Sequence, residues 1–253
     1  MIVANNSPQG AAFFNSSNEL VGNALKKQAD VVQFFSLADA NAALVEENAR
    51  LKQELLGFQI KPDSMPLAID STLAATFELK GARVVANSLR FSQNYLTIHK
   101  GAKDGIKPGM GVFNSQGIVG RVKSVSENYA VAFSVLNTSL LISAKIKSSE
   151  VFGSVQWDGV NTSEVQLLYV PRHVKASKGD TIITSGFNAI FPEGLLIGQI
   201  SNVEVNKKDP NYLAITVKLS TDFSKLNYVY LVENTQIQEL DSLYRKSDLP
   251  NEY

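Results

Sequence analysis

Residues that could carry catalysis are scarce in this chain. It contains two histidines, His99 and His173, and no cysteine. A serine peptidase would need one of these histidines as the base for Ser185 and Asp180 to orient that base, but no GxSxG motif surrounds the serine. Such a triple arises by chance in a serine-rich chain. We therefore expect both histidines to be solvated and no residue to be catalytic.

Metal, phosphate and nucleic-acid chemistry have no better support. The sequence lacks an HExxH motif and any close cluster of histidine or carboxylate ligands. Gly109-Met-Gly111 lacks the further glycine and the strand-to-helix context of a phosphate-binding loop. The 24 acidic and 24 basic residues balance, and no basic run occurs, so the electrostatic footprint of a nucleic-acid-binding protein is missing. We expect no metal, no cofactor and no nucleic-acid partner.

Most of the chain carries the alternating apolar pattern of β-strands. Between residues 82 and 232, short alternating runs are separated by turns rich in Gly, Asn, Ser and Asp, as in small barrels. The pattern Gly-x-Val/Ile-x-x-Val occurs at residues 120–125 and again at 198–203. The fold is therefore expected to be mainly β, with an N-terminal α-helical coiled coil and two small six-stranded β-barrels.

The strand count predicts how the two barrels share the chain. Residues 81–92 and 165–235 are expected to form a first, discontinuous barrel, and residues 93–164 a second barrel inserted in it. The alternative is a simple sequential split. Before the barrels, residues 1–19 are expected to be a polar lead-in, 20–60 the coiled-coil helix and 61–80 a proline-containing linker, while 236–253 read as a flexible tail.

Residues 34–58 are expected to organise the molecule by pairing two copies. Their heptad pattern places Phe34, Asn41, Asn48 and Leu55 at a, and Leu37, Leu44, Leu51 and Phe58 at d. A buried asparagine at a satisfies its amide against the same residue of an in-register partner, which favours a parallel dimer. Glu47 at g and Lys52 at e would add opposite charges across that interface. The alternative, an amphipathic helix packed on its own domain, fits the narrow apolar seam less well.

The order of several motifs resembles the rod shape-determining MreC family. These motifs are GAKDGIKPGMGV at residues 101–112, GIVGRV at 117–122, and the block YVPRHVKASKGDTIITSGFNAIFPEGLLIGQI at 169–200. FFNSSN at residues 13–18 is similar to the Bacteroidetes branch of the family. The resemblance covers most of the chain, and KGDTIITSG followed closely by FPEGLLIG is its most specific part.

The resemblance implies a non-catalytic scaffold in the periplasm. Such proteins carry an N-terminal transmembrane helix in the inner membrane, a coiled coil that forms homodimers or larger assemblies, and two barrels that bind peptidoglycan elongation proteins. The implied partners are a class B penicillin-binding protein, MreD and the MreB system. This sequence shows neither a bilayer-spanning apolar run nor a signal peptide, so we expect a chain without the membrane helix.

Two proline-flanked aromatic sites are candidate partner-binding surfaces. Proline cannot donate to a β-ladder, so Pro171 and Pro192 are expected at edges or in loops. The hypothesis is that neighbouring aromatic side chains, those of Tyr169, Phe187 and Phe191, contact a partner; the alternative is that they plug loops. A different binding class, an envelope adaptor of the membrane-fusion type, usually has a helical hairpin that interrupts a β domain. Here one helical segment precedes all the strands.

Overall fold

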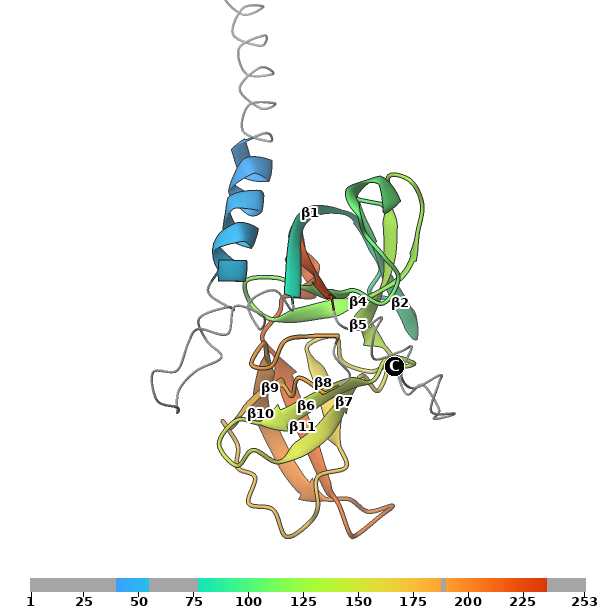
Figure 1. Ribbon diagram of the computed structural model, residues 1–253. Helices are drawn as coiled ribbons and strands as arrows, with labels where there is room; N and C mark the ends of the chain where they lie inside the picture. The colour runs from blue at the N-terminus through green and yellow to red at the C-terminus, as the bar shows by residue number, and fades with distance from the viewer. Residues whose placement is uncertain (1–39, 55–76, 188–189, 236–253) are drawn as a thin grey trace, which may run out of the picture. The chain divides into compact units, whose positions relative to one another are not determined.

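The computed structural model describes residues 40–54, 77–187 and 190–235 (Figure 1). The expected lead-in, the linker, the tail and four of the heptad residues, Phe34, Leu37, Leu55 and Phe58, lie outside the described residues. The chain divides into two units, Met1–Leu44 and Val45–Tyr253. The second unit holds every strand that the structure describes.

An α-helix occupies residues 40–54. Alanine, leucine and glutamate dominate this stretch and glycine and proline are absent from it, which favours helix. Arg50 adds ion pairs one turn away in both directions, with Glu47 at 2.7 Å and Glu54 at 3.2 Å. Within the described ranges, no helix combines the length and the apolar character needed to cross a membrane.

The strands close into two antiparallel barrels of six strands each. Barrel 1 has the order β1-β12-β3-β4-β5-β2 and barrel 2 the order β10-β11-β8-β7-β6-β9. The strands of barrel 1 are β1 (Phe77–Asn87), β2 (Gln93–Ile98), β3 (Gly111–Phe113), β4 (Ile118–Val125), β5 (Ala130–Asn137) and β12 (Tyr228–Asn234). Those of barrel 2 are β6 (Ile142–Ile146), β7 (Phe152–Gln156), β8 (Glu164–Leu168), β9 (Thr181–Thr184), β10 (Leu196–Val205) and β11 (Leu213–Leu219). The 3₁₀ turns Ala102–Asp104 and Phe223–Lys225 complete the described elements.

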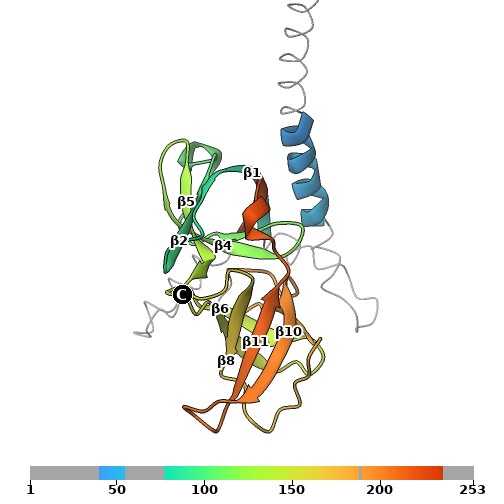
Figure 2. The ribbon, with the colours of Figure 1, turned by 180° about the vertical axis from the view of Figure 1, so that it is seen from behind.

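Barrel 2 is inserted between β5 and β12 of barrel 1, so the expected residue ranges were wrong. Residues 93–137 belong with β1 and β12, and the strands of 164–219 pair with β6 and β7. Figures 1 and 2 both show β12, near the red end of the colour scale, beside β1. Alternation identifies strands but carries no information on which distant strand completes a ladder, and this explains the error.

The internal repeat corresponds to one structural device used once in each barrel. A Cβ on Gly120 would lie 1.9 Å from the carbonyl oxygen of Phe133, and a Cβ on Gly198 would lie 2.1 Å from that of Lys218. Each glycine is followed by a shift in strand register, between Val122 and Ser124 in β4 and at the matching place in β10. Close approach followed by a bulge bends the strand, as closing a small barrel requires.

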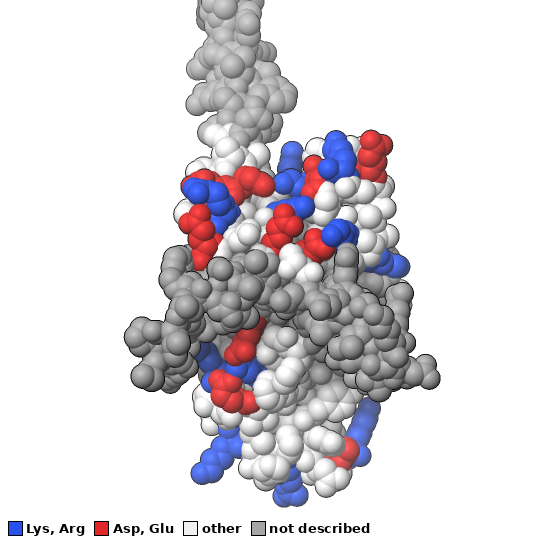
Figure 3. All heavy atoms as spheres, in the orientation of Figure 1, with Lys and Arg blue, Asp and Glu red and all other residues white. Residues whose placement is uncertain are grey.

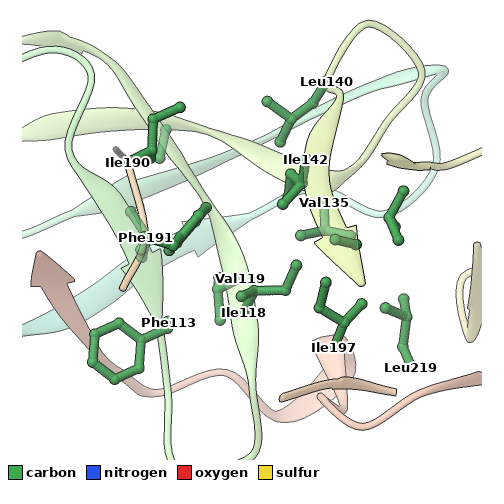
Figure 4. Close-up of a cluster of buried hydrophobic side chains, with 14 of the residues drawn as sticks. Phe113, Ile118, Val119, Val135, Leu140, Ile142, Ile190, Phe191, Ile197 and Leu219 are labelled. Carbon is green, nitrogen blue, oxygen red and sulfur yellow. The ribbon is translucent and has the colours of Figure 1, made fainter. Parts of the chain in front are cut away.

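An apolar layer joins the two barrels. Figure 4 shows side chains from both barrels meeting there, among them Phe113, Val119, Leu140, Ile190, Phe191, Ile197 and Leu219. Leu140 belongs to the β5–β6 connection, and Ile190 and Phe191 belong to the β9–β10 loop (residues 185–195). This layer continues the barrel interiors as one hydrophobic cluster.

Candidate interaction surfaces

One face of the N-terminal helix packs on barrel 1. Ala49 is 1% exposed, and Val45 lies so close to Gly81 of β1 that a Cβ on that glycine would be 2.6 Å from the valine methyl. Gln53 Oε1 accepts a hydrogen bond from the Leu79 amide at 3.3 Å. Lys52 Nζ lies 5.7 Å from the centre of the Tyr230 ring, within cation–π range. On this face the helix packs on its own domain, as the alternative to the coiled-coil prediction proposed.

The predicted dimer seam occupies a different face of the same helix. Leu44 is 58% and Leu51 43% exposed, and Asn41 and Asn48 are exposed as well. The charges expected to pair between copies have intrachain contacts here: Glu47 pairs with Arg50, and Lys52 contacts Tyr230. The helix therefore packs on the barrel without covering its d-position leucines, and pairing through the seam stays a prediction.

The β9–β10 loop places its two aromatic side chains in opposite environments. Phe187 is 58% exposed and packs against Phe152 of β7, with ring centres 4.6 Å apart. Phe191 is 5% exposed and sits over Gly111 of β3, where a Cβ would lie 2.6 Å from its ring. Phe191 was expected as a partner contact, and this expectation is wrong because the ring fills the space that glycine leaves between the barrels.

The prolines and Tyr169 also have defined places. Pro192 is buried, and its carbonyl accepts a hydrogen bond from Thr184 Oγ1 at 2.6 Å, so it anchors the loop rather than facing a partner. Pro171 forms an isolated bridge with Tyr212. Tyr169 is 59% exposed, has a φ of 66° and meets the Tyr212 ring edge-on at 6.4 Å. Tyr169 and Phe187 are therefore the predicted aromatic residues that reach the surface.

A buried lysine fixes the β9–β10 loop on the outer side of β6. Lys145 is 5% exposed and pairs with Glu150 and, at 2.5 Å, with Glu193. Burial by itself would lower the pKa of Lys145, but the hydrogen bonds and charges of the two glutamates outweigh burial and raise it. Lys145 and Phe152 were not among the predicted site residues. The alternation of apolar and polar residues places both side chains on the solvent side of their strands, and it does not reveal that a loop folds over them.

A groove of about 550 Å³ lies beside this loop, between the barrels. It is lined by Pro108, Gly109, Arg121, Val122, Lys123 and Phe133 of barrel 1, by Ser139, Leu140 and Leu141 of the β5–β6 connection, and by Ile190. Lys123 Nζ lies 4.8 Å and 5.1 Å from the ring centres of Tyr95 and Phe133. On the face seen in Figure 3, acidic and basic side chains are interspersed over both barrels.

The residues considered for peptidase chemistry make contacts with other groups. Ser185 Oγ lies 2.7 Å from Ser143 Oγ, and Asp180 accepts a hydrogen bond from the Ser177 amide. His99 stacks on Tyr129 in barrel 1, with ring centres 5.1 Å apart. In the described part of the chain, no group of three or more His, Cys, Asp or Glu side chains is placed to hold a metal ion. The fold defines a protein built of two closed six-stranded β-barrels.

Residues 84–233 match the family described as Rod shape-determining protein MreC, barrel core. The chain belongs to the MreC family, a periplasmic and non-enzymatic family of cell shape-determining proteins. This confirms the resemblance and the expectation of a non-catalytic protein, and it argues against the peptidase and membrane-fusion readings.

Curated relatives extend the same match. The Cell shape-determining protein MreC of Listeria monocytogenes is 27% identical over 195 residues, 76% of this chain and 66% of the relative. That of Haemophilus influenzae is 28% identical over 221 residues, 82% of this chain and 62% of the relative. The chain thus spans less than two thirds of the length of these relatives.

Solved structures show the same fold. MreC from Listeria monocytogenes superposes with a TM-score of 0.58 at 25% identity, covering 87% of this chain and 96% of that one. A chain of the complex between Penicillin-Binding Protein (PBP2) and MreC from Helicobacter pylori gives a TM-score of 0.52 at 16% identity, covering 63% and 99%. The expected two-barrel, mainly β fold is confirmed.

Proposed function

We propose that this chain is a periplasmic scaffold of the cell-elongation machinery that recruits and activates a class B penicillin-binding protein. The observation that carries the proposal is the match of the barrel core to MreC, together with the shared fold of the Helicobacter pylori MreC solved in complex with PBP2. The function is positional: the barrels hold a synthase in place, and pairing of two copies through residues 34–58 raises the effective concentration of the second site.

The exposed pair of Phe152 and Phe187 is the proposed contact for the synthase. Aromatic side chains dominate the energy of protein interfaces when a partner covers them. These two rings pack against each other in a tilted arrangement, and Phe187 belongs to a loop whose other end is anchored by Lys145 and by buried Phe191. The surface is therefore preorganised, which lowers the entropy lost on binding. Tyr169 and Pro171 are a second proposed contact at the Tyr212 side of barrel 2.

Binding of the chain to the periplasmic part of its own organism's class B penicillin-binding protein tests this proposal. By biolayer interferometry, Phe187→Ala should weaken binding about tenfold, because truncating an interface aromatic typically costs about 1–2 kcal/mol. Val160→Ala, at an apolar side chain that is 83% exposed in the β7–β8 loop, is the matched control and should bind as the parent does. Equal affinity of the Phe152→Ala, Phe187→Ala and Val160→Ala variants would exclude this surface.

The wider partnerships belong to the same proposal. In it, the scaffold is held at the inner membrane by a helix outside this chain and works with MreD and with the MreB system on the cytoplasmic side. Support for these partners comes from family membership alone. Co-purification of a full-length form with MreD and MreB from detergent-solubilised, crosslinked membranes would test these two partnerships. If neither protein co-purifies after crosslinking, the proposed partnerships with MreD and MreB are contradicted.

A further inference from the structure

The groove between the barrels combines apolar walls with positive charge. Among the described residues that line it, the charged ones are Arg121 and Lys123, both basic. Its apolar lining includes Phe133 and Leu141, and Leu141 is 43% exposed. Such a surface is complementary to a peptide segment that carries acidic side chains among apolar ones.

One row of paired residues leads from the last strand of the chain into this groove. Val232 of β12 pairs with Gly111, Gly111 with Arg121, and Arg121 with Phe133. Neighbouring strands lie about 4.8 Å apart, so the backbone of Arg121 is roughly 10 Å from that of Val232. The final strand of the fold thus ends within two strand widths of the basic side chains.

The chain leaves barrel 1 at the rim of the groove. Glu233, next to last in β12, forms an ion pair with Lys107 at 2.6 Å, and Lys107 directly precedes the lining residues Pro108 and Gly109. From Thr235 an extended chain spans about 3.3 Å per residue, so position 239 can reach roughly 13 Å from that point. That reach exceeds the two-strand spacing of roughly 10 Å that separates β12 from β4.

The segment after Thr235 has acidic side chains among apolar ones, which is the composition complementary to the groove. It reads QIQELDSLYRKSDLPNEY, with Glu239 and Asp241 set among Ile237, Leu240 and Leu243. We propose that residues 236–243 dock in the groove of their own chain, with Glu239 and Asp241 facing Arg121 and Lys123 and the intervening apolar side chains on Phe133 and Leu141. The docked segment bridges the two barrels. This inference does not depend on the proposed function.

Hydrogen exchange of the full-length chain tests the docking. In Glu239→Lys with Asp241→Lys, amides of residues 107–110, 121–123 and 139–141 should exchange about threefold to tenfold faster, because each exposed ion pair contributes roughly a twofold to fivefold factor. The matched control, Asp248→Lys with Glu252→Lys, reverses two acidic residues further along and should leave these rates unchanged. The changed positions lie outside both barrels, so circular dichroism should report the same melting temperature for all three chains.

Charge reversal on the groove side completes the test. Arg121→Glu with Lys123→Glu should speed exchange in the same segments, and combining it with Glu239→Lys and Asp241→Lys should restore slow exchange. Lys103→Glu with Lys178→Glu, at exposed lysines outside the groove, is the control for net charge. Docking within one chain would be overturned if exchange is unchanged in Glu239→Lys with Asp241→Lys, or if the combined variant does not restore protection. It would also be overturned if protection rises with protein concentration, and that result would assign the groove to a second copy of the chain.

Discussion

Phe191 and Gly111 show how one side chain joins two domains. The phenylalanine ring occupies the place where any other residue at 111 would carry its Cβ. Full burial of such a ring contributes roughly 1.5–3 kcal/mol, and leaving a cavity there costs more. At the scale of single residues, the junction between the barrels therefore depends on this ring and on the absence of a side chain opposite it.

Phe191→Ala should lower the free energy of unfolding by about 3–4 kcal/mol, the usual loss for emptying a buried aromatic site. Phe187→Ala in the same loop should change it by less than about 1 kcal/mol, because that ring is 58% exposed. Urea denaturation followed by fluorescence of Trp157 measures both. Similar losses for the two variants would show that the barrels do not rely on this contact.

Lys145 gives the protein a stability term that is lost in alkali. Because the folded state raises the lysine pKa above its ordinary value of 10.5, its contribution is fully present below that value and disappears as the pH rises through the folded pKa. The parent protein should therefore lose stability more steeply than Lys145→Met does as the pH rises above 10.5. The measurement is the urea midpoint of unfolding of both proteins as a function of pH. If the ion pairs of Lys145 do not stabilise the fold, the midpoints of the parent and of Lys145→Met will fall in parallel.

The N-terminal helix uses its faces for different purposes. Val45, Ala49 and Gln53 contact barrel 1, and the exposed leucines lie on another face. Ala42 and Ala49 occupy equivalent heptad positions, yet Ala42 is exposed and Ala49 is 1% exposed. Ala49 is buried because its turn of the helix packs on the wall of barrel 1.

Ala49→Glu should detach the helix from barrel 1, because a buried carboxylate without a partner is strongly unfavourable. Exchange of the amides at 45–53 and 77–82 should accelerate at least tenfold, while β4 and β10 keep their protection. Ala42→Glu is the matched control and should alter neither segment. A helix that stays protected in both variants would contradict docking through this face.

Much of this architecture could be predicted from sequence, and the errors have physical causes. The helix, the strand positions and the paired glycine bends follow from local patterns, since period and turn chemistry are local properties. The assignment of strands to the two barrels could not be predicted from local patterns. Strand β12 pairs with β1 and β3, and the whole of barrel 2 separates β12 from them in the sequence. Phe187 and Phe191 are both phenylalanines in the same loop, so local sequence cannot tell which ring is buried. Only the tertiary fold determines that Phe191 is buried and Phe187 is exposed.

At the scale of the whole molecule, the proposed scaffold function rests on self-association through residues 34–58, which stays a prediction. Leu44→Asp should convert a dimer to a monomer in light scattering over a concentration series, because it places a charge in the apolar seam. Glu46→Gln, at heptad position f on the side of the helix away from the seam, is the control and should preserve the mass. A parent chain that is monomeric at every accessible concentration would contradict pairing by this segment alone.

The insertion of barrel 2 also sets the order in which the molecule can be completed during its synthesis. All strands of barrel 2 are contiguous in the chain, so that barrel can close as soon as its own residues are available. Barrel 1 waits for β12, and until that strand arrives β1 and β3 present open edges to any other β-strand nearby. A chain cut short after barrel 2 would therefore carry one finished domain beside one that is prone to aggregate, because the closure of barrel 1 depends on the last strand to be synthesised.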